Sequence, residues 1–189
     1  SITSQSNGLG SGAFFPIGTT TETFVVTDAS GNQSSCSFTI TVNDTELPTI
    51  ACPNNVIVSN DPGDCGALVT YVIPSGTDNC PGTVTMQTNG LGSGAFFPVG
   101  TTTETFMVTD AAGNQTSCSF SISVNDTELP ILTCPLFVEV DAQSPSGAIV
   151  DFVVMASDNC TPVPSLTTVP SSGSLFPIGE TTVISTAID

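Results

Sequence analysis

One long passage occurs twice in this chain. Residues 7–53 reappear 82 positions later as residues 89–135, with mostly conservative differences such as Ile17 to Val99. A fixed period with near-identical copies predicts a serial array of supersecondary units. We expect residues 1–47 to be the C-terminal part of one repeat, residues 48–129 a complete repeat and residues 130–189 the N-terminal part of a third.

The pattern within a repeat predicts β-strands. Apolar and hydroxyl side chains alternate without a break over residues 117–124 and 35–42, as in a strand with one buried face. Residues 103–110 predict a second strand of the same hairpin, and no segment shows helical spacing. About seven short strands in each 82-residue unit fit an all-β, immunoglobulin-like β-sandwich. Because the linkers have no flexible Gly/Ser run, we expect the tandem repeats to form an extended rod.

The charge of the chain is entirely of one sign. It has 17 acidic residues and no Lys, Arg or His, giving a formal net charge of -17. Binding to nucleic acid or to an anionic membrane requires cationic side chains, so both are excluded as partners. No apolar run reaches the roughly 18 residues of a membrane span, so we also expect no membrane insertion.

Composition also argues against catalysis. Without His or Lys the chain has no conventional base to activate Ser or Thr, and without Arg it has no bidentate clamp for a charged substrate. A pair of carboxylates could hydrolyse a glycosidic bond, but the chain lacks Trp and has a single Tyr. The glycine-rich residues 89–94 precede neither a Lys nor a helix, which favours a loop over a phosphate cradle. We predict that the chain is not an enzyme.

Several separate motifs resemble the hyalin repeat (HYR) family. They are Cys52-Pro53, Asp78-Asn79-Cys80, residues 97–102, residues 109–114 and residues 118–120, and the third repeat has Asp158-Asn159-Cys160 and residues 176–179. The match covers essentially the whole chain, although Ser146 stands in the third repeat where Cys65 stands in the second. The resemblance implies immunoglobulin-like domains associated with extracellular adhesion, as in giant bacterial cell-surface proteins and gliding adhesins.

Acidic residues gather where successive repeats are expected to meet. One interpretation is solubility and turn geometry, because Asp and Asn favour loops. The other is Ca²⁺, which takes six to eight hard oxygen ligands. The candidate ligands are Asp44, Glu46, Asp78 and Asp110 at the first junction, and Asp126, Glu128, Asp158 and Asp189 at the second.

Seven cysteines without a CxxC pair or a His predict disulfides in an oxidising compartment. We expect Cys80 to bond Cys118, because both lie at the same end of one sandwich. We also expect an inter-repeat bond from Cys65 to Cys134, across the linker. This leaves Cys36, Cys52 and Cys160 to pair with cysteines outside these 189 residues.

The sequence therefore predicts a structural and adhesive extracellular filament or stalk at the cell surface. Its expected partners are neighbouring repeats of the same chain, laterally associated copies and a surface or glycan ligand. The alternative is a spacer or binding module attached to a secreted enzyme or a ligand-binding tip.

Overall fold

The computed structural model describes residues 1–189 and is all-β, which confirms the predicted fold class. The chain forms two compact units. One comprises Ser1–Ala51, Pro74–Met86 and Phe106–Cys118, and the other Cys52–Ile73, Gln87–Thr105 and Ser119–Asp189. No helix in the chain is long and apolar enough to cross a membrane. We refer to residues 1–47, 48–129 and 130–189 as repeats 1, 2 and 3.

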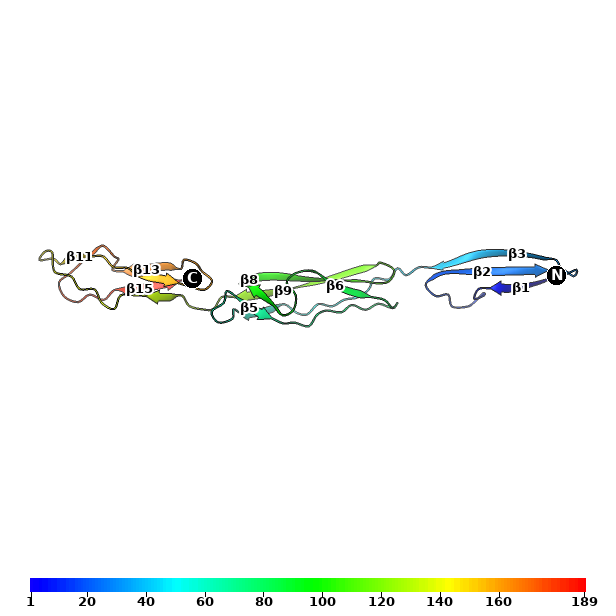
Figure 1. Ribbon diagram of the computed structural model, residues 1–189, viewed down its shortest axis with the longest axis horizontal. Helices are drawn as coiled ribbons and strands as arrows, with labels where there is room; N and C mark the ends of the chain where they lie inside the picture. The colour runs from blue at the N-terminus through cyan, green and yellow to red at the C-terminus, as the bar shows by residue number, and fades with distance from the viewer. The chain divides into compact units, whose positions relative to one another are not determined.

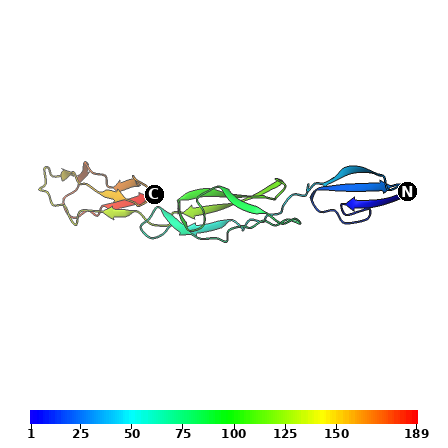
Figure 2. The ribbon, with the colours of Figure 1, turned by 45° about the vertical axis from the view of Figure 1, so that its right-hand side comes forward.

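Repeat 1 forms a three-stranded antiparallel sheet. It contains β1 (Ile2–Asn7), β2 (Gly18–Thr27) and β3 (Gln33–Val42) in the order β1-β2-β3, and the strands lie side by side in both ribbon views (Figures 1 and 2). The long β2–β3 hairpin comes from alternating Thr and apolar residues around a turn at Asp28 and Gly31. Strand β3 has a partner on one side only, so its outer edge is free.

Repeat 2 has two sheets, as expected for a sandwich. The larger has the order β4-β9-β8-β6 and the smaller pairs β5 with β7. The strands are β4 (Val56–Ser59), β5 (Gly66–Val69), β6 (Val84–Asn89), β7 (Ala95–Pro98), β8 (Gly100–Thr109) and β9 (Gln115–Asn125). Strand β4 is parallel to β9, with Val56 opposite Ile122.

Alternation along these strands sends every second side chain into the core. Both sheets of repeat 2 contribute buried residues, which are Ala67, Val69, Phe97, Phe106, Val108, Phe120, Ile122 and Val124. Phe97 is fully buried whereas its neighbour Phe96 is 45% exposed.

Repeat 3 is built from three two-stranded ladders. They pair β10 (Ile131–Thr133) with β12 (Met155–Ser157), β11 (Ala148–Val150) with β14 (Ser174–Phe176), and β13 (Ser165–Val169) with β15 (Ile184–Ile188). The antiparallel β10–β12 pair places Ser157 opposite Ile131, at the end where repeat 3 follows the linker. This register positions the loop after β12.

A buried carboxylate organises the glycine-rich loop of repeat 2. Glu104 on β8 is fully buried, and its side chain accepts hydrogen bonds from the amides of Leu91 (2.8 Å) and Gly92 (3.1 Å). The Gln87 amide (2.7 Å) and the Tyr71 hydroxyl (2.7 Å) donate two more. The loop does cradle an anion, but that anion is the repeat's own Glu104.

The same arrangement recurs in repeat 1 and is replaced in repeat 3. Glu22 is 2% exposed and accepts from the amides of Leu9 (2.7 Å) and Gly10 (3.2 Å). In repeat 3, Val183, which immediately precedes β15, aligns with the glutamate, and the loop contains Pro170, which has no amide hydrogen to donate. The repeat that lacks the glutamate thus also lacks one of its amide donors. This is expected because a buried charge without hydrogen-bond partners is destabilising.

Candidate functional site: the junctions between repeats

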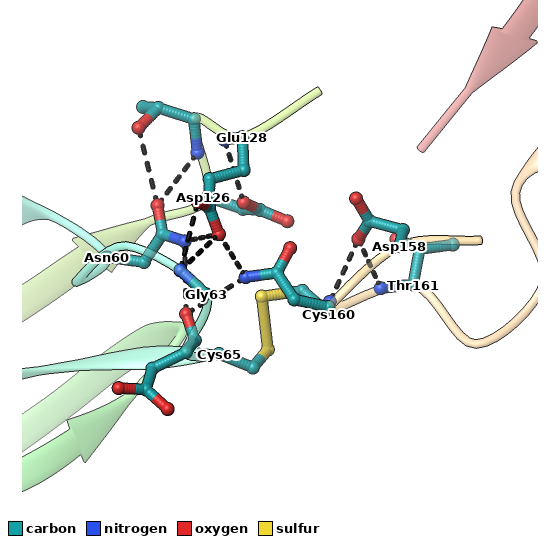
Figure 3. Close-up of a disulfide and its surroundings, with 11 residues drawn as sticks. Asn60, Gly63, Cys65, Asp126, Glu128, Asp158, Cys160 and Thr161 are labelled. Atoms are coloured by element: carbon teal, nitrogen blue, oxygen red, sulfur yellow. Dashed lines mark hydrogen bonds between the residues drawn. A yellow bond between two sulfur atoms is a disulfide. The ribbon is translucent and has the colours of Figure 1, made fainter. Parts of the chain in front are cut away.

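The junction between repeats 2 and 3 is centred on the carboxylate of Glu128. This residue lies in the linker after β9 and accepts hydrogen bonds from the amide of Gly63 (2.9 and 3.0 Å), from Asn60 Nδ2 (3.3 Å) and from Asn159 Nδ2 (2.6 Å). Figure 3 shows Asn60 and Gly63 beside Glu128. Asn159 Nδ2 also reaches the Asp64 carbonyl at 3.0 Å. The glutamate thus joins a turn of repeat 2 to a loop of repeat 3.

Asn60 fixes the linker against the same turn. Its side chain is almost fully buried, Oδ1 accepts from the amide of Thr127 (3.1 Å), and Nδ2 donates to the Asp64 carbonyl (3.0 Å). Its backbone amide donates to Asn125 at 2.9 Å. The linker leaves β9 already hydrogen-bonded to repeat 2, so it is not a loose tether.

A disulfide between Cys65 and Cys160 connects the two repeats. The Cα atoms are 4.8 Å apart and the cysteines are separated by 95 positions (Figure 3). The predicted Cys65–Cys134 bond is therefore wrong, as is the expectation that Cys160 pairs outside these residues; Cys134 is a free thiol. The reason is the β10–β12 register. Strand β12 is antiparallel to β10, so Cys160, which follows β12, lies near the linker. Cys134 follows β10 and therefore lies at the opposite end of the strand pair.

Three carboxylates gather at the same junction. Oxygens of Asp126, Asp158 and Asp189 lie within 4.8 Å of one another. Oδ2 of Asp158 accepts from the amides of Cys160 and Thr161, both at 2.8 Å. Its Oδ1 is buried and has no hydrogen-bond partner. That oxygen is desolvated without compensation, which is costly for a carboxylate unless a cation neutralises it.

The junction between repeats 1 and 2 repeats this design with one difference. Asp44, Asp78 and Cys80 place one ligand atom each within 4.8 Å of the others, and Oδ1 of Asp78 is again buried without a partner. Asn79 Nδ2 donates to Glu46 at 2.6 Å, as Asn159 does to Glu128.

Cys80 is a free thiol, so the predicted Cys80–Cys118 bond is also wrong. Cys118 and Cys52 are both disulfide-bonded within the chain, so the expectation that Cys52 pairs outside these residues is wrong as well. Cys80 occupies the position that Cys160 holds in repeat 3, facing a junction. Burial, a hydrogen bond to Asp44 and the negative charges of Asp44, Asp78 and Glu46 raise the pKa of the Cys80 thiol.

The predicted ligand residues fall into three groups. Asp44 with Asp78, and Asp126 with Asp158 and Asp189, come together as carboxylate clusters. Glu46 and Glu128 instead accept amide hydrogen bonds. Asp110 lies outside the first cluster, because its carboxylate is bound by the side chain (2.8 Å) and amide (2.7 Å) of Asn114.

The clusters suit a hard divalent cation. Carboxylate oxygens are the ligands that Ca²⁺ prefers, and both Asp78 and Asp158 offer a buried oxygen that no protein group satisfies. The second cluster is all oxygen, whereas Cys80 gives the first a softer donor.

Sequence reasoning missed Asn60, Asn79 and Asn159. The sequence does contain a signal for the last two, because the Asp-Asn-Cys motif and a linker Glu occur together at each junction. Glu46 accompanies Asn79 at the first junction, and Glu128 accompanies Asn159 at the second. A pair of residues that recurs together across a repeat boundary indicates contact.

Comparison with known proteins identifies the family. The HYR domain matches residues 1–42 and 43–124. The chain belongs to the HYR domain family. This confirms the resemblance seen in the motifs, and membership of this family of non-catalytic modules confirms that the chain is not an enzyme. The boundaries at residues 47/48 and 129/130 stay predictions.

Several relatives share HYR sequence with this chain. "Hyalin" of Strongylocentrotus purpuratus is 33% identical over 182 residues, which are 92% of this chain and 15% of that protein. "Hyalin" of Lytechinus variegatus is 33% identical over 94% of this chain and 35% of its own length. "Serine-rich adhesin for platelets" of Staphylococcus aureus is 32% identical over 57% of this chain and 5% of its own length. The chain thus spans about a third or less of each relative.

Among solved structures, one similar chain contains the extracellular cadherin domains 1–4 of protocadherin gamma B7. The alignment covers 81% of the present chain and 44% of the protocadherin chain. The TM-score is 0.39 and the sequence identity 14%.

Proposed function

We propose that the chain is a structural and adhesive extracellular module, part of a filament or stalk in which HYR repeats are held at a fixed geometry to their neighbours. The observation that carries this proposal is the junction of repeats 2 and 3. There the Cys65–Cys160 disulfide and two hydrogen bonds of Asn159, to Glu128 and to Asp64, link consecutive repeats. A module built only for display would not need covalent coupling between repeats.

An extracellular or cell-surface location is supported by the cysteines. Four of them are disulfide-bonded, and structural disulfides persist mainly in oxidising compartments. The names of the relatives, hyalin and a serine-rich adhesin for platelets, support the adhesive role. The partners are then neighbouring repeats of the same chain, laterally associated copies and a surface or glycan ligand.

Small-angle X-ray scattering tests the filament geometry. A repeat whose strands, loops and linker span about 35 to 45 Å gives an extended chain a radius of gyration of about 30 Å, against about 16 Å for a compact domain of this length. A value near 16 Å would refute the rod. Beads coated with the chain should attach to a target surface; failure on every surface, with the rod geometry intact, would favour the spacer alternative.

We further propose that Ca²⁺ binds at the junctions, held by Asp126, Asp158 and Asp189 in the second and by Asp44 and Asp78 in the first. A bound cation would satisfy the buried oxygens of Asp78 and Asp158 and offset the mutual repulsion of the carboxylates. The ion would supply cross-linking charge and no chemistry.

Calorimetric titration of the intact chain tests this site. Extracellular Ca²⁺ modules bind with a Kd of about 0.1 to 1 mM, so 10 mM Ca²⁺ should stabilise the chain by roughly 1.5 to 3 kcal/mol. Asp158→Asn should abolish the effect at the second junction, and Asp141→Asn, an exposed carboxylate outside it, should not. An unchanged melting temperature on adding Ca²⁺ and then a chelator would refute the proposal.

A further inference from the structure

The smaller sheet of repeat 2 is apolar on both of its faces. Ala67, Val69 and Phe97 point into the core and are at most 4% exposed. Leu68 and Phe96 point outward, lie opposite one another in the β5–β7 register, and are 68% and 45% exposed. A solvated sheet face normally carries polar side chains, whereas a sheet that is covered on both sides is apolar on both. The outer face of this sheet thus has the composition of a covered face.

The apolar outer face continues past the end of β5. The amide of Tyr71 donates to Ser93 Oγ at 2.9 Å, and Ser93 Oγ donates to the Tyr71 carbonyl at 2.8 Å, so the two chain segments stay paired. Val72, the next residue to point outward, is 83% exposed. We call Leu68, Val72 and Phe96 the outer strip of repeat 2.

The Phe96 ring lies along the sheet instead of projecting into solvent. A Cβ atom at Gly66 would overlap this ring, and Gly66 is buried although it lies on the outward side of β5. The glycine lets the ring rest on the backbone. This keeps the outer strip flat, as packing against a second sheet requires.

The larger sheet of the same repeat has an ordinary polar outer face. Its outward residues on β8 and β9 are mainly Thr and Ser, and their hydroxyls pair across the strands. Thr101 bonds Ser123 and Thr105 bonds Ser119, both at 3.0 Å. Repeat 2 therefore has one hydroxyl face and one apolar face. Exposed apolar residues that gather on one face of a soluble domain mark a contact surface.

The outer strip recurs in repeat 3 with different side chains. Ile149 and Leu175 lie opposite one another in the β11–β14 register, and both are 58% exposed. Val153 takes the third position and is also exposed. A carboxylate, Asp151, lies between Ile149 and Val153 on this face, so the strip of repeat 2 is the uncharged one. Positions that stay apolar and exposed while the side chains change indicate a shared contact.

The charge of the chain restricts how two copies can meet. All 17 charged side chains are acidic, so copies repel one another unless the surfaces in contact carry no carboxylate. The outer strip of repeat 2 is such a surface, and a second copy offers the same one. Two identical faces are complementary about a two-fold axis, which is the commonest symmetry of homo-oligomers.

We propose that the outer strip of repeat 2 packs against the same strip of a second copy, sheet face on sheet face. This inference rests on the proposed filament function and supplies the contact through which copies associate laterally. One strip offers far fewer residues than the roughly 20 to 30 on each side of a stable interface. A single contact is therefore weak, and chains with more repeats associate more tightly because their contacts add.

Sedimentation equilibrium of the intact chain tests the self-association. Cys36→Ser, Cys80→Ser and Cys134→Ser are included so that free thiols cannot join copies. A monomer–dimer equilibrium should appear at millimolar protein. Its Kd should fall as salt rises from about 0.15 M to about 1 M, because the screening length shortens from about 8 Å to about 3 Å and the copies repel less. A monomer under all these conditions would overturn the proposal and leave the strip to a partner of other chemistry.

Matched substitutions locate the contact. Leu68→Thr with Val72→Thr keeps side chains that favour strands and should raise the Kd about tenfold or more, because each copy loses two apolar contacts. Ile57→Thr with Val84→Thr, at exposed positions on strands of the larger sheet, should leave the Kd unchanged. Melting temperatures check that all variants fold. An equal loss with both pairs, or no loss with the first, would refute the assignment.

Photo-crosslinking identifies the surface that the strip meets. p-Benzoylphenylalanine in place of Phe96 should join two copies, and peptide mapping should find the second attachment within residues 66–72 or 92–98. Attachment elsewhere would exclude two-fold packing of the strips. Scattering from dilute protein separates this inference from the proposed function. An extended chain that fails to associate contradicts only the contact, whereas a compact chain contradicts the filament.

Discussion

A buried carboxylate destabilises a protein unless hydrogen bonds replace its lost water. Glu104 receives four such donors, and two of them are backbone amides of the glycine-rich loop. The loop closes tightly around the carboxylate at Gly90, where φ is +105° and a Cβ atom would overlap the carboxyl group of Glu104. Burial and the hydrogen bond to Glu104 raise the pKa of Tyr71, so that hydroxyl stays protonated and continues to donate.

Replacing Glu104 by Gln should destabilise the chain by about 2 to 3 kcal/mol, because an amide nitrogen would face backbone N–H groups, which can only donate. Gly90→Ala should also destabilise, through the positive φ and the overlap. Denaturant unfolding measures both, and Glu180→Gln at an exposed site is the control. If Glu104→Gln proves as stable as that control, the carboxylate does not hold the loop.

At the scale of elements, the β2–β3 and β8–β9 hairpins share a turn in which an Asp accepts from an Asn four positions later. Asp28 Oδ2 accepts from Asn32 Nδ2 at 2.9 Å, and Asp110 accepts from Asn114 in the same way. The Asn32 side-chain and backbone hydrogen bonds hold the pKa of Asp28 below its usual 3.8. For Asp110, burial acts to raise the pKa, but the hydrogen bonds from Asn114 and its neighbours outweigh it and the pKa is lowered.

Because the pKa of Asp28 is lower in the folded chain, its contribution to stability is present above about pH 4 and is lost as the pH falls through the folded pKa. Asn32→Ala should return the pKa of Asp28 toward 3.8. Carboxyl NMR titration measures this, with the exposed Asp141 as an internal reference. An unchanged Asp28 titration in the variant would show that Asn32 is not the cause.

Local patterns were enough to predict much of these elements. Strict alternation at residues 117–124 predicted β9. The disulfides were not predictable in the same way, because Cys65 and Cys160 meet only through the β10–β12 register, a tertiary feature that residue spacing does not encode. The role of the glycine-rich loop was missed because its anion is internal: no Lys or helix was needed to mark the site.

For the molecule as a whole, the charge of -17 with no basic residue means that no acidic group is neutralised by a salt bridge. Mutual repulsion of this kind opposes compact states and is strongest at low ionic strength. At the junction of repeats 2 and 3, Asp126, Asp158 and Asp189 are nevertheless held together. The Cys65–Cys160 disulfide and the Glu128 hydrogen bonds act there against the repulsion.

Removing the disulfide should therefore cost more at low salt than at high salt. Closing a loop across 95 positions contributes about 4 to 5 kcal/mol by restricting the unfolded chain, so Cys65→Ala/Cys160→Ala should lower the melting temperature by roughly 10 to 15 °C at 0.15 M salt. At 0.01 M salt, where the screening length grows from about 8 Å to about 30 Å, the loss should be larger, because only the Glu128 hydrogen bonds then oppose the repulsion of the junction carboxylates. Calorimetry at dilute protein concentration measures both values, with Cys36→Ala as the control. A loss independent of salt would mean that the disulfide acts only on the unfolded chain and does not restrain a self-repelling junction.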